Sequence, residues 1–468
     1  MSGSGRPNIL VLMPDQFRAD CLGVAAHPCV QTPELDRLAR DGTRFEGCYS
    51  ASPICMPARA AFLTGKPPQQ TGMWRNQGRV TTATPTYAQI MSKEGYRTGH
   101  IGKSHYYEHL KNTHLRDELP YMRSLGLEDV QETTGPHATR WTDSILSDHW
   151  ERRGLLTTFR EDYRRREEHR KRTGREALWP SPVPEEEHMD SFVGTMAVTY
   201  LLEYRDSRPF CLFVGFGGPH EPWDPPASWA QRYESTDPPS PLPTPELSAW
   251  LTPEAREYQS KITNKTFPDG DWQALRRLYY AKVSHVDHWI GRILSALDAR
   301  GLTDSTHVIF FSDHGERACD RGGLYKSVFF DDSVRVPAII RRADGQNAGQ
   351  VVPGLCSNMD LLPTMLDMGG LESRGWIGKS LLPSTLDAGA ALHDVVGSQI
   401  EFGPLRTTMI RTARGKLVVD QKSRALQMFD VQRDPHEMSN LVGNPDATAL
   451  ENDLRRSLRE WMLIARVN

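Results

Sequence analysis

The chain has 468 residues and a formal net charge of −3. Hydrophobic residues make up 38% and charged residues 25% of it, a composition typical of folded proteins that excludes a disordered chain. The balanced charge gives no reason to expect nucleic acid as a partner. The opening residues contain neither a basic region nor a long apolar stretch, so we expect a cytoplasmic protein with no membrane association.

Strands and helices are expected to alternate along most of the chain. Apolar runs predict buried strands, and helical spacing or helix-capping residues predict helices. In chain order we expect a strand at 8–13, helices at 33–40, 57–63 and 87–93, strands at 96–101 and 210–216, a helix at 272–297 and a strand at 307–312. This alternation predicts an α/β domain over residues 1–385, with a large, mostly parallel sheet covered by helices on both faces.

The predicted secondary structure changes near residue 385, from alternating strands and helices to a series of short strands. Short strands with turns between them are expected at 395–400, 408–411, 416–419 and 425–430, followed by a helix at 447–464. Residues 386–468 therefore read as a smaller α+β subdomain built on an antiparallel sheet.

Two segments stand out by composition. Residues 152–175 are rich in arginine, but acidic residues are interleaved, which is typical of a solvent-exposed, salt-bridged helix rather than a nucleic-acid patch. The proline-rich stretch 237–246 predicts a loop. Segment 106–190, which carries no recognisable motif, is expected to shape substrate choice rather than chemistry.

The cysteines give the first chemical signal. Seven of them are scattered along the chain with no C-x-x-C pair, which argues against a disulfide framework and a structural zinc site. Cys55 directly precedes a predicted helix start, and Arg59 follows one turn later. The positive end of a helix and a nearby guanidinium favour an anionic, activated side chain at residue 55.

Two aspartates follow predicted strands. Asp15 lies just beyond the strand at 8–13, and Asp313 follows the strand at 307–312. Because functional sites of parallel sheets gather at the carboxyl ends of strands, these residues are candidate metal ligands. The run Gly102-Lys103-Ser104 suggests a nucleotide-binding loop, but that motif needs glycine at position 97, which is Arg97. The nucleotide interpretation is therefore rejected.

Four motifs in order resemble those of the sulfatase family. Cys55-x-Pro-x-Arg59 resembles the signature in which the cysteine is oxidised to formylglycine, with Met56 where a small residue is usual. The other matches are GYRTGHIGKSH at 95–105, with Ser104 in place of an aromatic residue, SDHGE at 312–316 and PDQFRAD at 14–20. Residues 426–441 look like the C-terminal region of the family.

The resemblance implies an alkaline phosphatase-like fold and a sulfatase mechanism. The metal ligands would be Asp15, Gln16, residue 55, Asp313 and His314, with Ca²⁺ favoured and Mn²⁺ the alternative because of the imidazole. By resemblance, Arg59 stabilises the nucleophile and His220 protonates the leaving alcohol. Lys103 and Lys326 bind the sulfuryl group, and His105 is a candidate base. The partners implied are a small-molecule or saccharide sulfate ester and a formylglycine-generating enzyme.

Other functions could use the same residues. The Asp-Gln and Asp-His pairs also resemble those of phosphonate monoester hydrolases, which makes a phosphonate monoester or phosphodiester hydrolase the main alternative. A phosphatase of the superfamily would normally use serine or threonine where this chain has Cys55. A catalytically inactive binding module would have lost some ligand, yet all the core positions are filled.

Overall fold

The computed structural model describes residues 5–263, 270–390 and 392–467. Its main feature is an eight-stranded sheet in the order β4-β3-β5-β1-β6-β7-β2-β8. The strands are β1 (Asn8–Asp15), β2 (Thr43–Tyr49), β3 (Arg97–Lys103), β4 (Asp129–Thr133), β5 (Phe210–Pro219), β6 (Thr306–Phe311), β7 (Ala338–Arg341) and β8 (Gln350–Ser357). Within this sheet β7 alone runs against the others, so the predicted mostly parallel sheet is confirmed.

The central strand β1 explains the layered architecture. Leu10 and Leu12 belong to the hydrophobic cluster on one face of the sheet, and Ile9 and Val11 to the cluster on the other. A strand buried on both sides must be apolar throughout, which is why its sequence reads as a continuous apolar run.

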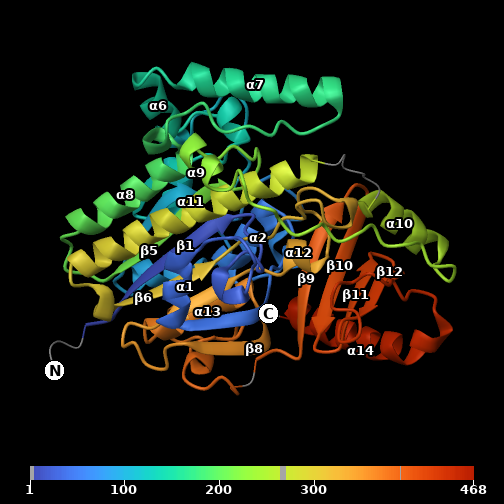
Figure 1. Cartoon of the computed structure of the whole chain (residues 1–468). Helices are drawn as coiled ribbons and strands as arrows, with labels where there is room; N and C mark the ends of the chain where they lie inside the picture. The colour runs from blue at the N-terminus through green and yellow to red at the C-terminus, as the bar shows by residue number, and fades with distance from the viewer. Residues whose placement is uncertain (1–4, 264–269, 391, 468) are drawn as a thin grey trace.

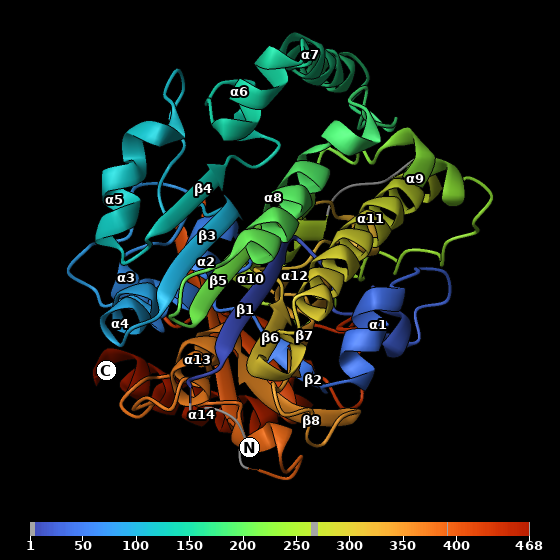
Figure 2. The same cartoon turned by 90° about the vertical axis from the view of Figure 1, so that its left-hand side faces the viewer.

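Helices cover both faces of this sheet (Figures 1 and 2). One face packs against α1 (Pro33–Arg40), α8 (Met189–Glu203), α9 (Ala227–Arg232) and α11 (Asp271–Ala299). The other packs against α2 (Cys55–Thr64), α4 (Tyr87–Lys93), α5 (Leu119–Ser124) and α13 (Leu361–Met368). The other helices include α10 (Pro253–Thr263) and the short α3 (Pro68–Thr71) and α12 (Asp331–Val334).

A second sheet lies at the C-terminal end, as predicted. Its strands are β9 (Val395–Phe402), β10 (Leu405–Thr412), β11 (Gly415–Asp420) and β12 (Ala425–Asp430), all antiparallel to their neighbours. The helix α14 (Thr448–Val467) packs on one face through side chains that include Leu454 and Trp461. The other face packs against Tyr49 and Phe329 of the larger part. The boundary at residue 385 stays a prediction.

Several elements were not predicted from the sequence: β2, β4, β7, β8, α8 and α13. The edge strand β8 contains Pro353, which an edge position tolerates but which hides the strand in the sequence. Residues 237–246 form neither helix nor strand, as expected. No helix in the described part of the chain is both long and apolar enough to cross a membrane.

The arginine-rich segment corrects one expectation. It forms α7 (Leu156–Thr173), which lies with α6 (Ile145–Arg152) apart from the main sheet (Figure 1). Its outer face is solvated, as in the Arg164–Glu168 pair, but Phe159, Tyr163 and Arg166 are buried. The expectation of a purely solvated helix was therefore wrong for one face, because tertiary contacts cover it.

Candidate active site

Four buried side chains converge where β1, β6 and α2 meet. Asp15 ends β1, Asp313 and His314 follow β6, and Cys55 begins α2. Since β1 and β6 are adjacent and parallel, their carboxyl ends lie together. The potential ligand atoms of Asp15, Cys55, Asp313 and His314 all lie within 4.8 Å of one another, and no more than 1% of any of these residues is exposed.

The orientation of His314 suits a metal ligand. Its Nδ1 is 3.0 Å from the carbonyl of Gly315, so an Nδ1–H group can donate there and leave Nε2 facing the cluster. Nε2 lies 3.1 Å from Cys55 Sγ, 3.7 Å from Asp15 Oδ1 and 3.8 Å from Asp313 Oδ2. Burial lowers the pKa of His314, but the negative charges of Asp313 and Cys55 outweigh it and raise the pKa to about 9. A divalent cation at Nε2 would take the place of that proton.

Buried cations balance the two aspartates. Arg59 Nε donates to Asp313 Oδ2 at 2.8 Å and its terminal nitrogen to Asp15 Oδ2 at 3.0 Å, and all three side chains are fully buried. Lys103 also pairs with Asp15. Burial and the charge of Cys55 raise the pKa of Asp15, but Lys103, His220 and Arg59 hold it well below its usual range, so this carboxylate stays ionised.

Several cations act on residue 55. Burial raises the pKa of the Cys55 thiol, but Lys103, His314 and Lys326 outweigh it and hold the pKa well below its usual range. The sulfur therefore marks a place where the protein stabilises a negatively charged nucleophile.

Gln16, Lys326 and His220 lie side by side next to this cluster. The Lys326 ammonium donates to the amide oxygen of Gln16 and lies 2.7 Å from His220 Nε2. Gln16 Nε2 donates to Glu221 at 2.8 Å, and the main-chain N–H of Gln16 donates to Asp313 Oδ1 at 3.0 Å. The amide oxygen of Gln16 is thus held by Lys326, and its place among the metal ligands stays a prediction.

A polar network lies behind residue 55. His105 helps to lower the pKa of Cys55, and its ring is 5.0 Å from that of His109. His109 Nε2 lies 4.0 Å from a carboxylate oxygen of buried Glu132, which accepts hydrogen bonds from Ser104 and Tyr107. This network gives Ser104, which departs from the family motif, a structural role.

The structure thus brings every predicted site residue into one region. Sequence reasoning missed Glu221, Glu132 and the contact of Glu316 with Gln16. The first follows His220 directly and Glu316 lies within the SDHGE motif, so proximity to motif residues was the available signal. Glu132 lies in an unpredicted strand and had no signal.

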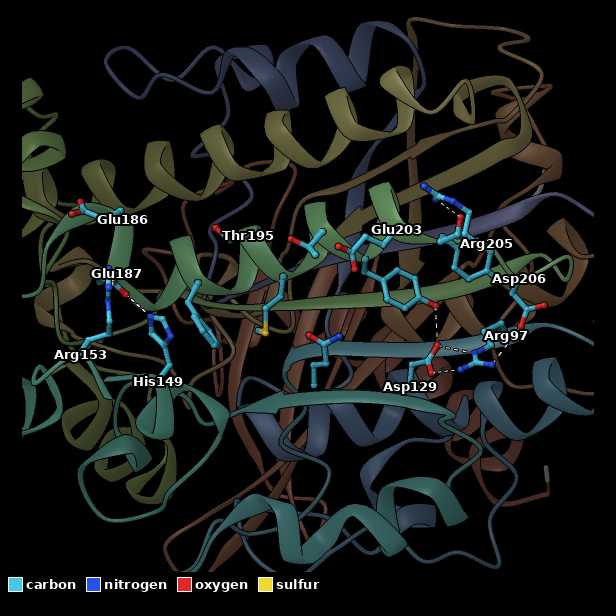
Figure 3. A pocket seen from close by; sticks show the side chains of 16 residues that line it. Arg97, Asp129, His149, Arg153, Glu186, Glu187, Thr195, Glu203, Arg205 and Asp206 are labelled. Atoms are coloured by element: carbon cyan, nitrogen blue, oxygen red, sulfur yellow. Dashed lines mark hydrogen bonds and ion pairs between the residues drawn. The ribbon is translucent and has the colours of Figure 1, made fainter. Parts of the chain in front are cut away.

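A hollow of about 900 Å³ elsewhere contains none of these residues (Figure 3). It lies beside α8 and β4, and several of its charged residues pair with one another. Examples are Arg97 with Asp129 at 2.6 Å and Arg153 with Glu187 at 2.7 Å. We therefore assign the chemistry to the strand-end cluster rather than to this larger hollow.

Comparison with known proteins identifies the class. Residues 7–371 match the sequence profile described as "Sulfatase", and residues 320–463 match that of the C-terminal part of N-sulphoglucosamine sulphohydrolase. The chain therefore belongs to the sulfatase family. The predicted family and the prediction of an enzyme that hydrolyses sulfate esters are confirmed.

Individual relatives match over nearly the whole chain. This chain is 29% identical to an arylsulfatase of Clostridium perfringens, in an alignment that covers 97% of this chain and 94% of the arylsulfatase. It is 28% identical to a choline-sulfatase of Rhizobium meliloti, covering 94% and 83%. The structure of a phosphonate monoester hydrolase of Agrobacterium radiobacter superposes with a TM-score of 0.78 at 22% identity, covering 98% and 96%. This last likeness confirms the fold.

Proposed function

We propose that the chain hydrolyses sulfate monoesters with formylglycine, formed from Cys55, as the nucleophile. A divalent metal, with Ca²⁺ favoured over Mn²⁺, would be held by Asp15, Gln16, residue 55, Asp313 and His314. The observation that carries this proposal is the buried convergence of Asp15, Cys55, Asp313 and His314 at the strand ends. The proposal requires a formylglycine-generating enzyme as a partner. It also includes a cytoplasmic location for the protein.

The residues present fit such an ion. Carboxylate and amide oxygens suit Ca²⁺, whereas the imidazole of His314 makes Mn²⁺ acceptable. When bound, the metal would supply Lewis acidity toward the nucleophile and the sulfuryl oxygens. Arg59 forms ion pairs with both Asp15 and Asp313, which supports a role in holding the two carboxylates in position.

Two lysines support the binding of the sulfuryl group. Lys103 and Lys326 both lower the pKa of Cys55, so both charges act at the position of the nucleophile. Both ammonium groups would hold the sulfuryl oxygens and stabilise the charge that develops on them during attack.

His220 is suited to protonate the leaving alcohol. Its Nδ1 is 2.6 Å from the main-chain oxygen of Glu221 and 3.3 Å from the Glu221 carboxylate, contacts that fix the orientation of the ring. Its Nε2 lies on the same side as Lys326 and could deliver a proton to the ester oxygen there. For the second half of the reaction, Asp313 and His105 remain the candidate bases.

A phosphonate monoester or phosphodiester hydrolase is the alternative proposal. With Gln16 and His314 in place of further carboxylates, the ligand set carries one negative charge fewer than a set with three aspartates. One unit charge at ~4 Å is worth about 4 kcal/mol at an effective dielectric near 20. Such a site accepts singly charged sulfate and phosphorus esters alike.

Residue 55 is tested by mass spectrometry and substitution. We expect the tryptic peptide to carry formylglycine in active protein and unmodified cysteine in protein from a host that lacks the modifying enzyme. Cys55→Ala should remove nearly all turnover while the circular dichroism spectrum is unchanged. Retention of more than a few per cent of activity would contradict the proposal.

The two substrate classes are separated by one comparison. On a single metal-replete preparation, kcat/KM is measured for p-nitrophenyl sulfate, p-nitrophenyl phenylphosphonate and a p-nitrophenyl phosphodiester. We expect a sulfate ester to be the best substrate. A phosphorus ester that wins by more than about tenfold, with no other sulfate ester better, would establish the alternative, and no turnover of any ester would indicate a binding module.

A further inference from the structure

A cavity of about 170 Å³ lies next to the proposed active site. Its lining comes from α7, from the loop that follows α7, from His137 ahead of α6 and from the segments around Glu221 and Tyr325. The lining residues are His137, Tyr163, Arg166, Glu167, Arg170, Glu176, Ala177, Glu221, Pro222, Trp223 and Tyr325. The helix contributes residues 163, 166, 167 and 170, a spacing that places them on one face.

Two of the lining residues, Glu221 and Tyr325, connect this cavity to the proposed catalytic residues. Glu221 lines it and also accepts from Gln16 and pairs with Lys326 at 3.4 Å. Tyr325, another lining residue, directly precedes Lys326 in the chain. An ester whose sulfuryl group is held by Lys103 and Lys326, with its alcohol on the side of His220, would therefore extend toward this cavity.

One wall is aromatic. The rings of Trp223 and Tyr325 stack, with centroids 5.6 Å apart and an angle of 11° between their planes. Tyr163 adds a third ring, and only 7% of that residue is exposed. The indole N–H of Trp223 is buried and has no acceptor among the described residues. Flat aromatic surface with a nearby donor suits a ring that carries both C–H groups and oxygens.

Hydrogen-bonding groups of the lining lie beside the Tyr325 hydroxyl. The Glu176 carboxylate accepts from the Tyr325 hydroxyl at 2.5 Å. The exposed guanidinium of Arg170 has one hydrogen-bond partner in the described chain, that same hydroxyl at 3.4 Å. A cation at the rim disfavours a cationic alcohol, while carboxylate and guanidinium together can accept from and donate to neighbouring hydroxyls.

We propose that this cavity is the subsite for the alcohol half of the substrate and that it selects a single monosaccharide ring. At about 170 Å³ it is smaller than the ~300–1,000 Å³ typical of pockets for drug-sized ligands. One polyhydroxylated ring fits this size and lining better than an extended saccharide. The inference rests on the proposed function, because it assumes that the sulfuryl group binds between Lys103 and Lys326.

The experiment compares kcat/KM for the positional isomers of glucose monosulfate, p-nitrophenyl sulfate and choline sulfate. The variants are Arg170→Ala and Glu176→Ala, with Arg164→Ala as the matched control on the outer face of α7. In the wild type we expect a glucose sulfate to exceed both other esters by at least about tenfold. The ratio of glucose sulfate to p-nitrophenyl sulfate should fall at least about tenfold in both variants and less than about threefold in the control.

Other outcomes would overturn the inference. The inference is overturned if kcat/KM for choline sulfate or for the aryl ester exceeds that for every glucose sulfate by tenfold. It is also overturned if the ratio of kcat/KM for glucose sulfate to that for p-nitrophenyl sulfate is unchanged in folded Arg170→Ala and Glu176→Ala. If no ester is hydrolysed by metal-replete protein carrying formylglycine, the proposed function has failed. In that case saturation-transfer NMR with glucose tests whether the cavity binds a monosaccharide. The inference is overturned if the wild type gives no saturation-transfer signal, or if both variants give the same signal as the wild type.

Discussion

At the scale of single residues, the proposed active site is a cluster of buried, charged side chains. Arg59, Lys103, Asp15 and Asp313 are all almost fully removed from water, and each forms an ion pair with another member of the set. Burying ions is costly unless they are paired and hydrogen-bonded, so such a set is difficult to justify by stability alone. It is the arrangement expected where a cation and an anionic substrate must be bound in fixed positions.

Metal removal is expected to destabilise the protein. A ligand that binds only the folded state at 100 times its Kd contributes about 2.7 kcal/mol. Treatment with EDTA should therefore lower the melting temperature by a few °C, and Ca²⁺ should restore it. The control is Asp313→Asn, in which chelation should have a smaller effect. If neither EDTA nor Ca²⁺ changes the melting temperature of the wild type, the result would contradict the metal site.

The buried Glu132 predicts a pH dependence of stability. Burial raises its pKa to about 7 in the folded protein, although Ser104 and Tyr107 donate to it. In the unfolded chain the value is about 4.3, so between these values the folded state holds a proton that the unfolded state has lost. Stability from this group is complete below about pH 4 and is lost as the pH rises through 7.

Glu132→Gln removes that titration. Relative to the wild type, the variant should gain about 3 kcal/mol in the free energy of unfolding between pH 4.5 and 7.5, because most of the difference of about 2.7 between the two pKa values, at ~1.36 kcal/mol per unit, is expressed in that range. Urea denaturation across this pH range measures the difference. A difference between the two proteins that does not change with pH would show that Glu132 is ionised throughout.

At the scale of elements, α7 shows how one helix serves two environments. Arg164 and Glu168 pair on its solvent face at 2.7 Å. On the other face Arg166 pairs with Asp162 at 2.6 Å and donates to the carbonyls of residues 177, 179 and 180 at 3.0–3.1 Å. Arg166 therefore fastens the following loop to the helix and completes the wall of the cavity.

Arg166→Ala is expected to loosen this region. It leaves the buried Asp162 without its cation and three carbonyls without a donor, and breaking a buried ion pair costs about 3–5 kcal/mol. Residues 137–180 should therefore exchange amide hydrogens faster and be cleaved sooner by trypsin. The control Arg164→Ala removes an exposed pair worth at most about 1 kcal/mol and should do neither. Equal protection in both variants would contradict the anchoring role.

At the scale of the whole molecule, the small sheet is joined to the large part by a buried lysine. Lys416 of β11 is fully buried and pairs with Asp331 at 2.6 Å and with Glu437. Its ammonium also donates to the main-chain oxygen of Phe329 at 2.8 Å. Apolar side chains of β9–β12 surround this contact and pack on Phe329 and Phe330. The two sheets should therefore unfold as one unit.

Lys416→Met tests this junction. Loss of the cation leaves Glu437 buried beside Asp331, and we expect unfolding to become easier by about 3–5 kcal/mol. The double variant Lys416→Met/Glu437→Gln, which removes one of the stranded charges but keeps an acceptor for the Asp331 N–H, should recover part of that loss. Chemical denaturation followed by fluorescence and circular dichroism measures both. Two separate transitions in the wild type would contradict the joint unfolding of the sheets.

The amino-acid sequence alone determined the parts whose signals are local. The buried strands β1, β5 and β6 appear as apolar runs, and the end of β1 and the residues after β6 supply Asp15 and Asp313. Cys55 and Arg59 are one helical turn apart, so their shared role is visible in a short motif. For the same reason the four ordered motifs predicted the family and the fold that the comparisons confirm.

Only the tertiary structure decided the contacts between distant segments. The pairing of Lys326 with Gln16 and Glu221, and the approach of α7 to Trp223 and Tyr325, join residues that lie far apart in the chain. Hydrophobic periodicity shows which face of a helix is apolar, but a polar face that lines a cavity looks the same as one in solvent. The subsite proposed for the alcohol therefore depends on how the chain packs, which no local pattern records.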